Sequence, residues 1–202
     1  MAPDKHDWTE YPPLPVGSVL AAALDQFVRV GYHGASMRDI ATGAGMKASS
    51  LYNHFPSKQA MLVRLVEMML EDLSWRIDAI VDQEGPADQR FDDLVRCLVA
   101  FHLRRQEIAF VALSELRSLQ PQHRRSVQEG RRAMQNRIDE LAVEATSAGR
   151  FHLNDPALPA RAVVRMCNSL CQEPVAGDHA GSHRALIDAH IEIARRMMNS
   201  CP

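Results

Sequence analysis

Between Ser36 and Lys58 the chain gathers basic, hydroxyl, amide and small side chains on two short segments that have helical character. They are Ser36, Arg38, Lys47, Ala48, Ser49, Ser50, Tyr52, Asn53, His54 and Lys58. Basic and hydroxyl groups hold phosphate oxygens, and a guanidinium can donate two hydrogen bonds to O6 and N7 of guanine. The set therefore indicates binding of a phosphodiester backbone and reading of base edges, with Arg38 as the candidate base reader.

The flanking residues predict two short helices joined by a glycine turn. Ser36 is a preferred N-cap, and Asp39 three positions later completes a capping box. Gly43 and Gly45 end the first helix, because glycine adopts left-handed backbone conformations at little steric cost. The second helix runs from about Lys47 to His54, with Leu51 and Phe55 facing inward. Pro56 ends it, and Ser57 caps the next helix. Two small helices around such a turn form a helix-turn-helix.

The run from Val16 to Lys58 resembles the DNA-binding domain of the TetR family of bacterial one-component repressors. The matching residues are Ala23, Phe27, Gly31, Tyr32, Ser36, Met37, Arg38, Asp39, Ile40, Ala41, Gly45, Ser50, Leu51, Tyr52, His54, Phe55, Ser57 and Lys58. The resemblance implies that the second helix of the motif lies in the major groove of operator DNA. It also implies that Tyr52, His54 and Lys58 grip the DNA backbone and that a phosphate lies at the helix start behind Ser36.

The sequence departs from this family at the start of the second motif helix, where many members carry a longer polar side chain. Small residues stand there, so either Ala48 contacts thymine methyl groups or Arg38 and Asn53 do more of the reading. Tyr52 and His54 have an alternative role in packing the domain. For Lys47 the alternative is a solvated charge.

Composition limits the class of protein. The chain has 202 residues, 46% hydrophobic residues, a formal net charge of −2 and four cysteines. Residues 16–58 carry four basic and two acidic side chains, a modest surplus that favours a dimer with twice as many phosphate contacts. No run of ~18 apolar residues predicts a membrane span. The first 15 residues show no export signal, so we expect reduced thiols and a cytoplasmic protein.

The remaining pattern predicts an all-α fold. A first helix over 16–30 has an apolar stripe that includes Leu20, Phe27 and Val30, and a long helix runs over 58–81. Further helices are expected over 91–105, 107–119, 121–148 and 154–172, with a last one ending near Met198. We expect a flexible arm over 1–15, in which Trp8 and Tyr11 are mobile, pack on the body or touch DNA. A helix-turn-helix domain over 16–60 and an effector-binding and dimerisation domain over 61–202 follow.

Dimerisation is implied by the family resemblance, since TetR-like subunits pair through a four-helix bundle built from two long C-terminal helices of each. By position these are the 153–172 region together with either the final helix or the long 121–148 helix. The sequence leaves both pairings open.

The larger domain is expected to hold a small hydrophobic effector. Residues 113–153 resemble TetR subfamilies that sense acyl-CoA thioesters, on Glu115, Leu116, Arg117, Pro121, Arg124, Arg131, Gly149 and Phe151. Methionines suit an irregular pocket and arginines suit CoA phosphates, although a plain core and a solvated face are the simpler interpretations. The candidate ligand residues are Met69, Phe101, Arg105, Phe110, Arg117, Met134 and Met166.

The sequence gives weaker support to a metal site, an enzyme, and a carrier or adaptor. Cys167, Cys171, His179 and His183 have a spacing that could grip Zn²⁺, but buried helical cysteines are common small hydrophobes, so we expect no metal and no cofactor. No P-loop, GxSxG or HExxH pattern predicts an enzyme. The alternative from another class is a helical ligand carrier or adaptor that keeps the motif only for packing.

Overall fold

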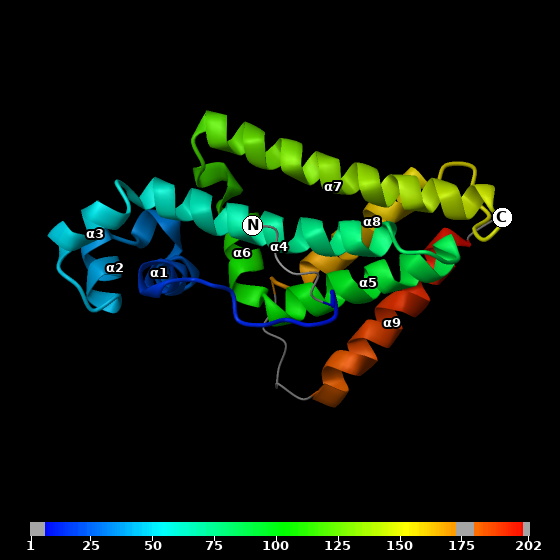
Figure 1. The fold of residues 1–202 in the computed structure, drawn as a ribbon, viewed down its shortest axis with the longest axis horizontal. Helices are drawn as coiled ribbons and strands as arrows, with labels where there is room; N and C mark the ends of the chain where they lie inside the picture. Colours follow the sequence, from blue (N-terminus) through cyan, green and yellow to red (C-terminus); the bar gives the residue numbers. More distant parts are fainter. Residues whose placement is uncertain (1–6, 173–179, 200–202) are drawn as a thin grey trace. The chain divides into compact units, whose positions relative to one another are not determined.

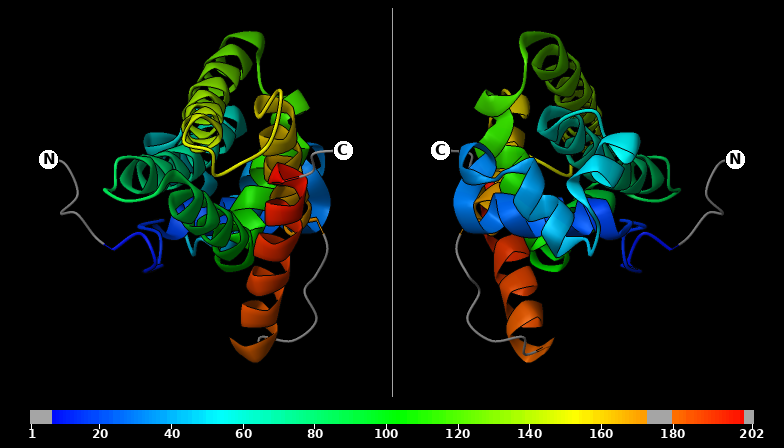
Figure 2. Two further views of the ribbon diagram at one scale, coloured as in Figure 1. Left: turned by 90° about the vertical axis from the view of Figure 1, so that its right-hand side faces the viewer. Right: turned by 90° about the vertical axis from the view of Figure 1, so that its left-hand side faces the viewer.

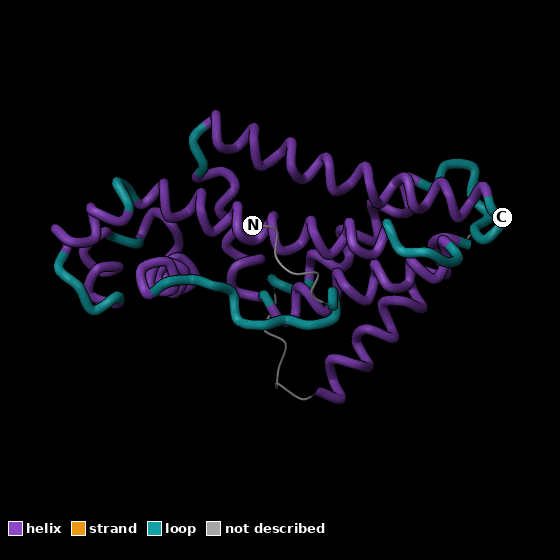
Figure 3. The backbone as a smooth tube through the Cα atoms, in the orientation of Figure 1, coloured by secondary structure: helices purple, strands orange, loops and turns teal. Residues whose placement is uncertain are grey.

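The computed structural model describes residues 7–172 and 180–199, and in these ranges it contains nine α-helices, one 3-10 turn and no strand (Figure 3). The expected all-α fold is confirmed. The elements are α1 (Ser18–Gly34), α2 (Met37–Gly43), α3 (Ala48–His54), α4 (Lys58–Val81), α5 (Ala87–Arg104), α6 (Gln106–Ser114), η1 (Glu115–Ser118), α7 (Pro121–Ser147), α8 (Ala157–Ser169) and α9 (Ala180–Met198).

The chain divides into two compact units. The helix-turn-helix unit comprises Pro12–Asp72 and Glu107–Gly130, and the C-terminal unit comprises Met1–Tyr11, Leu73–Gln106 and Arg131–Pro202. Helices α4 and α7 each contribute residues to both units (Figure 1). The domain boundaries at residues 15 and 60 stay predictions.

The core of the helix-turn-helix unit forms where α1 packs on α2 and α2 packs on α3. Ala23 and Phe27 of α1 are buried, as are Ile40 of α2 and Leu51 of α3. The prediction that Val30 belongs to the buried stripe is wrong, because its side chain is 52% exposed. Val30 lies three residues after Phe27, so its side chain points about 60° away from that of Phe27 around the helix axis. The backbone leaves helical geometry at the next residue, Gly31.

The C-terminal unit is built on α5, which packs against both α8 and α9. Its inward residues include Phe91, Leu94 and Phe101, and α9 faces it with Ile191 and Met198, all buried. The C-terminal part of α9 runs alongside α5, whereas the N-terminal part of α9 slants away from α5 (Figures 1 and 2).

Several predicted helices differ from the structure. The first continues to Gly34 through the interruption at Gly31, and the one predicted over 154–172 spans only Ala157–Ser169. The fifth helix starts at Ala87, one turn before the predicted Phe91, because the polar Asp88 and Gln89 hide its first turn from an apolar pattern. The predicted 107–119 helix divides at Glu115, where the backbone tightens into η1. In the described ranges no helix combines the length and apolarity that crossing a bilayer requires.

Candidate nucleic-acid interface

Helix α3 presents an open polar face. Leu51, its inward residue, is fully buried, whereas Ser49, Ser50, Asn53 and His54 are exposed. Ala48, in the first turn, is half-buried. Tyr52 is 53% exposed, an unusual state for a large aromatic side chain that could pack on its own domain. The outward residues of α3 are therefore free to meet another molecule.

Helix α2 begins with the predicted capping box. The Ser36 hydroxyl accepts a hydrogen bond from the Asp39 amide (3.1 Å) and donates one to the Asp39 carboxylate (2.5 Å). Arg38, between them, is exposed and points its polar group away from the core formed by Ile40 and Ala41. The cap fixes the start of the helix that carries Arg38.

The turn between α2 and α3 has the conformation that the glycines predict. Gly45 has φ +70°, a left-handed value that an L side chain would strain. The amide of Met46 then donates to the carbonyl of Ala41 (2.9 Å), and the Gly45 amide donates to Thr42 (3.1 Å). These bonds satisfy carbonyls left free at the end of α2, so the angle at which α3 leaves the turn is set locally.

Lys58, the first residue of α4, makes contacts within the helix-turn-helix unit. Its ammonium donates to the carbonyl of Ala35 (2.7 Å) and of His33 (3.4 Å), and lies 4.4 Å from the ring centroid of Tyr32. Burial lowers the pKa of Lys58, while the nearby Glu115 carboxylate acts in the opposite direction. An ammonium has three N–H donors, which leaves one for a phosphate. The predicted phosphate contact stays a prediction.

Glu115 of η1 holds the end of α1 in place. Gly31, at φ +72°, interrupts the helix and frees the following amide, and the Tyr32 amide donates to Glu115 Oε1 (3.0 Å). The Ser118 hydroxyl donates to the other carboxylate oxygen (2.7 Å). Burial, followed by the charge of Glu115, raises the pKa of Tyr32. The sequence predicted for Glu115 either a place in the effector resemblance or an ion pair with a surface arginine, although a glycine inside a helical run signals an amide that needs an acceptor.

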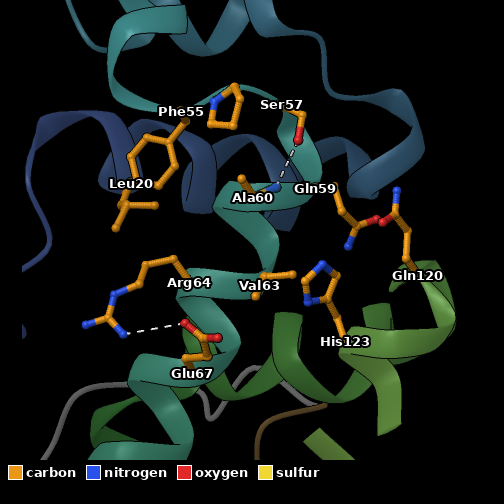
Figure 4. Close-up of a pocket in the computed structure, with 11 residues that line it drawn as sticks. Leu20, Phe55, Ser57, Gln59, Ala60, Val63, Arg64, Glu67, Gln120 and His123 are labelled. Carbon is orange, nitrogen blue, oxygen red and sulfur yellow. Dashed lines mark hydrogen bonds and ion pairs between the residues drawn. The ribbon is translucent and has the colours of Figure 1, made fainter. Parts of the chain in front are cut away.

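An open groove of about 610 Å³ lies along the first turns of α4 within this unit (Figure 4). Leu20 and Phe55 lie on one side of it, and Gln59, Gln120 and His123 lie together on the other. The Tyr32 hydroxyl donates to the Gln59 carbonyl (3.4 Å), and the Gln59 amide nitrogen is enclosed with no hydrogen-bond partner among the described residues. The groove is thus lined by the apolar Leu20 and Phe55 with the charged Arg64 and Glu67 below them, and by hydrogen-bonding side chains on the other side.

The candidate effector residues are divided between the two units. Met69, Phe110 and Arg117 belong to the helix-turn-helix unit, and Phe101, Arg105, Met134 and Met166 belong to the C-terminal unit. Met69 and Phe101 are buried and Arg117 is exposed, while the other four are half-buried. The structure brings Phe101 and Arg105 together around Tyr11, at 6.5 Å between rings and 5.7 Å from guanidinium to ring. The assignment of all seven to a ligand stays a prediction.

The zinc alternative gains no support from the described residues. Cys167 and Cys171 are buried in or beside α8, and His179 lies outside the described residues. Burial raises the pKa of Cys167 to about 12, which disfavours the thiolate that a metal needs. Within the described part of the chain no three His, Cys, Asp or Glu side chains stand close enough to hold a metal ion.

The fold and the open face of α3 define a class of protein, and two family models identify it. Residues 19–65 match the bacterial regulatory proteins of the tetR family, and residues 84–172 match the tetracyclin repressor-like C-terminal domain. The two segments make up about two thirds of the chain, and the chain belongs to the TetR family.

Particular relatives are similar over a shorter stretch. The HTH-type transcriptional repressor KstR2 of Mycobacterium tuberculosis is 37% identical over 78 residues, and this match spans 39% of the chain and 39% of the relative. A tetR-family regulatory protein from Rhodococcus RHA1 has the same fold, with a TM-score of 0.84, 24% identity and coverage of 92% of this chain and 97% of that one. AibR, solved with isovaleryl coenzyme A and operator DNA, aligns with a TM-score of 0.78 and 18% identity over 87% of this chain and 95% of its own.

Proposed function

We propose that this chain is a dimeric transcriptional regulator, acting as a repressor that binds a palindromic operator and is released by a small effector. The observation that carries the proposal is the face of α3, whose polar residues and Tyr52 are exposed while Leu51 alone anchors the helix. The family match over residues 19–65 supports it. The proposal includes a cytoplasmic location, where operator DNA lies, and no covalent catalysis.

The exposure of these side chains supports the roles that we propose for them. We propose that Arg38 reads guanine through its fork-shaped guanidinium, whereas Lys47, Tyr52 and His54 hold phosphates. Asn53 is the second candidate base reader. Ser36 is occupied by the cap, so we propose that it positions α2 and acts on DNA only through its helix start.

The proposal is tested by fluorescence anisotropy with DNA from upstream of the chain's own gene, compared with scrambled DNA. Replacing Arg38 by alanine should weaken specific binding by about 1–3 kcal/mol and change the base preference. Arg29→Ala is the matched control, because Arg29 is an exposed arginine of α1 paired with Asp25. Equal affinity and preference in Arg38→Ala and Arg29→Ala would remove Arg38 as base reader. Failure of the wild type to bind at any salt down to ~50 mM would favour the adaptor function.

We further propose that α8 and α9 form the dimer interface, the first of the two pairings open from the sequence. The two helices pack on each other, and each exposes a large apolar side chain, Leu158 at 70% and Ile193 at 45%. Leu158 is the most exposed large apolar side chain of the described residues. A second subunit that covers both would remove this apolar surface from water. Helix α7 exposes Val143, at 48%, which represents the other pairing.

Charged substitutions distinguish the pairings. Leu158→Glu combined with Ile193→Glu should turn the dimer into monomers and lower operator affinity by at least about a hundredfold, because one half-site supplies only half of the phosphate contacts. Val143→Glu should leave the dimer intact. Light scattering coupled to size exclusion gives the mass. Monomers with Val143→Glu and dimers with the double variant would reassign the interface to α7.

We propose an effector from the class of small hydrophobic compounds or acyl-CoA thioesters. The support is the resemblance of residues 113–153 to acyl-CoA-sensing subfamilies and the fold shared with AibR. To release DNA, the effector must prefer the non-binding form by a few kcal/mol. Mass spectrometry of the purified chain under native conditions would identify a retained ligand.

A further inference from the structure

The N-terminal segment Asp7–Tyr11 is packed on the C-terminal unit, where sequence alone favoured a loose arm; we call it the strap. The buried Arg76 of α4 donates to the carbonyl of Trp8 and stacks on the ring of Tyr11 at 3.9 Å. The Tyr11 hydroxyl donates to the carbonyl of Cys97 (3.2 Å). Thr9 donates its amide to Asp7 (2.9 Å), which closes a turn. The strap is therefore fixed in place at both ends.

A cavity of about 220 Å³ lies against this strap within the C-terminal unit. Trp8, Thr9 and Tyr11 form one wall, and α5 and α9 form the others. The side chains that matter from the helices are Arg96, Ala100, Leu103, Arg104, His183 and Ile187. Ligand pockets for drug-sized molecules usually enclose ~300–1,000 Å³. This cavity therefore suits a smaller compound and is too small for a nucleotide or a coenzyme A thioester.

The charged side chains of the lining favour an anion as the ligand of this cavity. Its lining contains two arginines and no acidic side chain. Arg96 is near Asp93 (3.6 Å), one turn earlier on the same helix, and their side chains are 44% and 37% exposed. A wall of one sign of charge next to apolar surface raises the local concentration of counter-ions. An anion with an apolar body is thus favoured over a cation or a neutral polar compound.

A histidine in the cavity lining has a ring nitrogen without a hydrogen-bond partner in the described part of the chain. His183 Nδ1 is enclosed and has no hydrogen-bond partner among the described residues. A buried polar atom without a partner costs free energy that a ligand atom can recover. In the tautomer that carries hydrogen on Nδ1, this atom donates to a carboxylate oxygen.

The register of the two helices places this histidine at about the same level as an arginine. Arg195 of α9 pairs with Asp92 of α5 through both carboxylate oxygens (3.0 and 3.1 Å from Nε), and the helices run antiparallel. Arg104 lies twelve residues after Asp92, and His183 lies twelve residues before Arg195, each about 18 Å along its helix from the ion pair. Although α9 slants away from α5 toward this level, both side chains line the cavity.

We propose that this cavity binds a small aromatic or branched aliphatic carboxylate. Arg104 and His183 hold the carboxylate, Leu103 and Ile187 contact the apolar body, and the Trp8 and Tyr11 rings of the strap cover it. The residues that line the site belong to the C-terminal unit and none belongs to the helix-turn-helix unit, so its test does not depend on DNA binding.

The test is isothermal titration of the full-length protein with benzoate and with the neutral isostere benzamide. We expect saturable binding of benzoate with a dissociation constant on the order of 0.1–1 mM. Benzamide should bind at least tenfold more weakly, since it lacks the charge. The proposal would be overturned if the two compounds bound with equal affinity, or if binding did not saturate at a benzoate concentration 20-fold above ~1 mM.

Variants locate the site. Arg104→Gln should weaken benzoate binding at least tenfold, and the control Arg29→Gln, at an exposed arginine of α1, should leave it unchanged. Ala100→Leu should fill the cavity and abolish binding. Undiminished binding in Arg104→Gln would place the benzoate elsewhere and end the proposal. If Ala100→Leu fails to fold, Arg104→Gln still decides, because Arg104 is exposed and its loss leaves no buried gap.

Discussion

Two cations of α4, one in each unit, make the same pair of contacts at very different depths. Lys58 lies 4.4 Å from the Tyr32 ring centroid and donates to the carbonyl of Ala35. Arg76 lies 3.9 Å from the Tyr11 ring centroid and donates to the carbonyl of Trp8. Lys58 is half-buried and meets one ring, whereas Arg76 is 1% exposed and also stacks on Trp75 at 4.6 Å.

The comparison indicates that burial of the cation, more than its chemical identity, determines how much such a contact stabilises the protein. Water screens the ammonium of Lys58, and a cation–π contact at an exposed site contributes about 0.5–1 kcal/mol. A desolvated guanidinium gains about 2 kcal/mol or more from a ring, and its loss also removes the hydrogen bond to the part-buried Trp8 carbonyl. We therefore expect Arg76 to determine the stability of its unit and Lys58 to act mainly on geometry.

The largest effect is expected from Arg76. Arg76→Ala should lower the free energy of unfolding by about 3 kcal/mol, because it removes a fully buried side chain and the hydrogen bond to Trp8. Urea unfolding followed by circular dichroism measures the loss. Arg76→Lys, which keeps a charge and an alkyl stem, should lose clearly less. A loss below about 1 kcal/mol in Arg76→Ala would mean that the strap adds little stability.

Acid should selectively lower the stability of the C-terminal unit, which contains Arg76, through protonation of His102. This histidine is 3% exposed, lies edge-on to Phe101 and has Nδ1 2.7 Å from the Leu98 carbonyl. Burial lowers its pKa, so the unfolded chain binds the proton first as the pH falls. Stability should thus be intact above about pH 6.5 and decline below it, by at most ~1.4 kcal/mol per pH unit from this group. Urea unfolding at pH 7.5 and pH 5.5 tests this, and His102→Gln should flatten the difference. An unchanged pH profile in that variant would contradict the assignment.

The smallest effect on stability is expected from Lys58. Lys58→Met keeps the packing of the stem and should cost about 1 kcal/mol or less. DNA binding distinguishes its two roles. If Lys58 only positions the end of α1, the dependence of log affinity on log salt keeps its slope. A slope smaller by about 0.9 per subunit would instead establish the phosphate contact predicted from the sequence.

Local features were predictable because they depend on residues a few positions apart. Ser36 caps α2 with Asp39 as expected, Gly45 takes the left-handed conformation, and the Ala60 amide donates to Ser57 (3.2 Å). The exposure of α3 follows from one inward residue, Leu51, in a seven-residue helix. The exposed face of α3 was therefore predicted almost residue by residue, although its role in binding DNA stays a prediction.

Contacts over long sequence separations were not predictable. Arg76 and Trp8 are 68 residues apart, and Glu115 and Tyr32 are 83 apart, so no spacing rule connects them. An arginine or glutamate on an amphipathic helix also has the same pattern whether it faces solvent or a distant backbone group. The strap and its cavity could be found only once the chain was folded.

The left-handed Gly31 has a consequence for sequence variation. Any side chain at this position would be strained by the backbone, although its first carbon would make only an ordinary contact, 3.5 Å, with the Glu115 carboxylate. In a saturation library selected for repression, position 31 should keep glycine alone, while position 34, a glycine with ordinary backbone angles three residues later, should accept small residues.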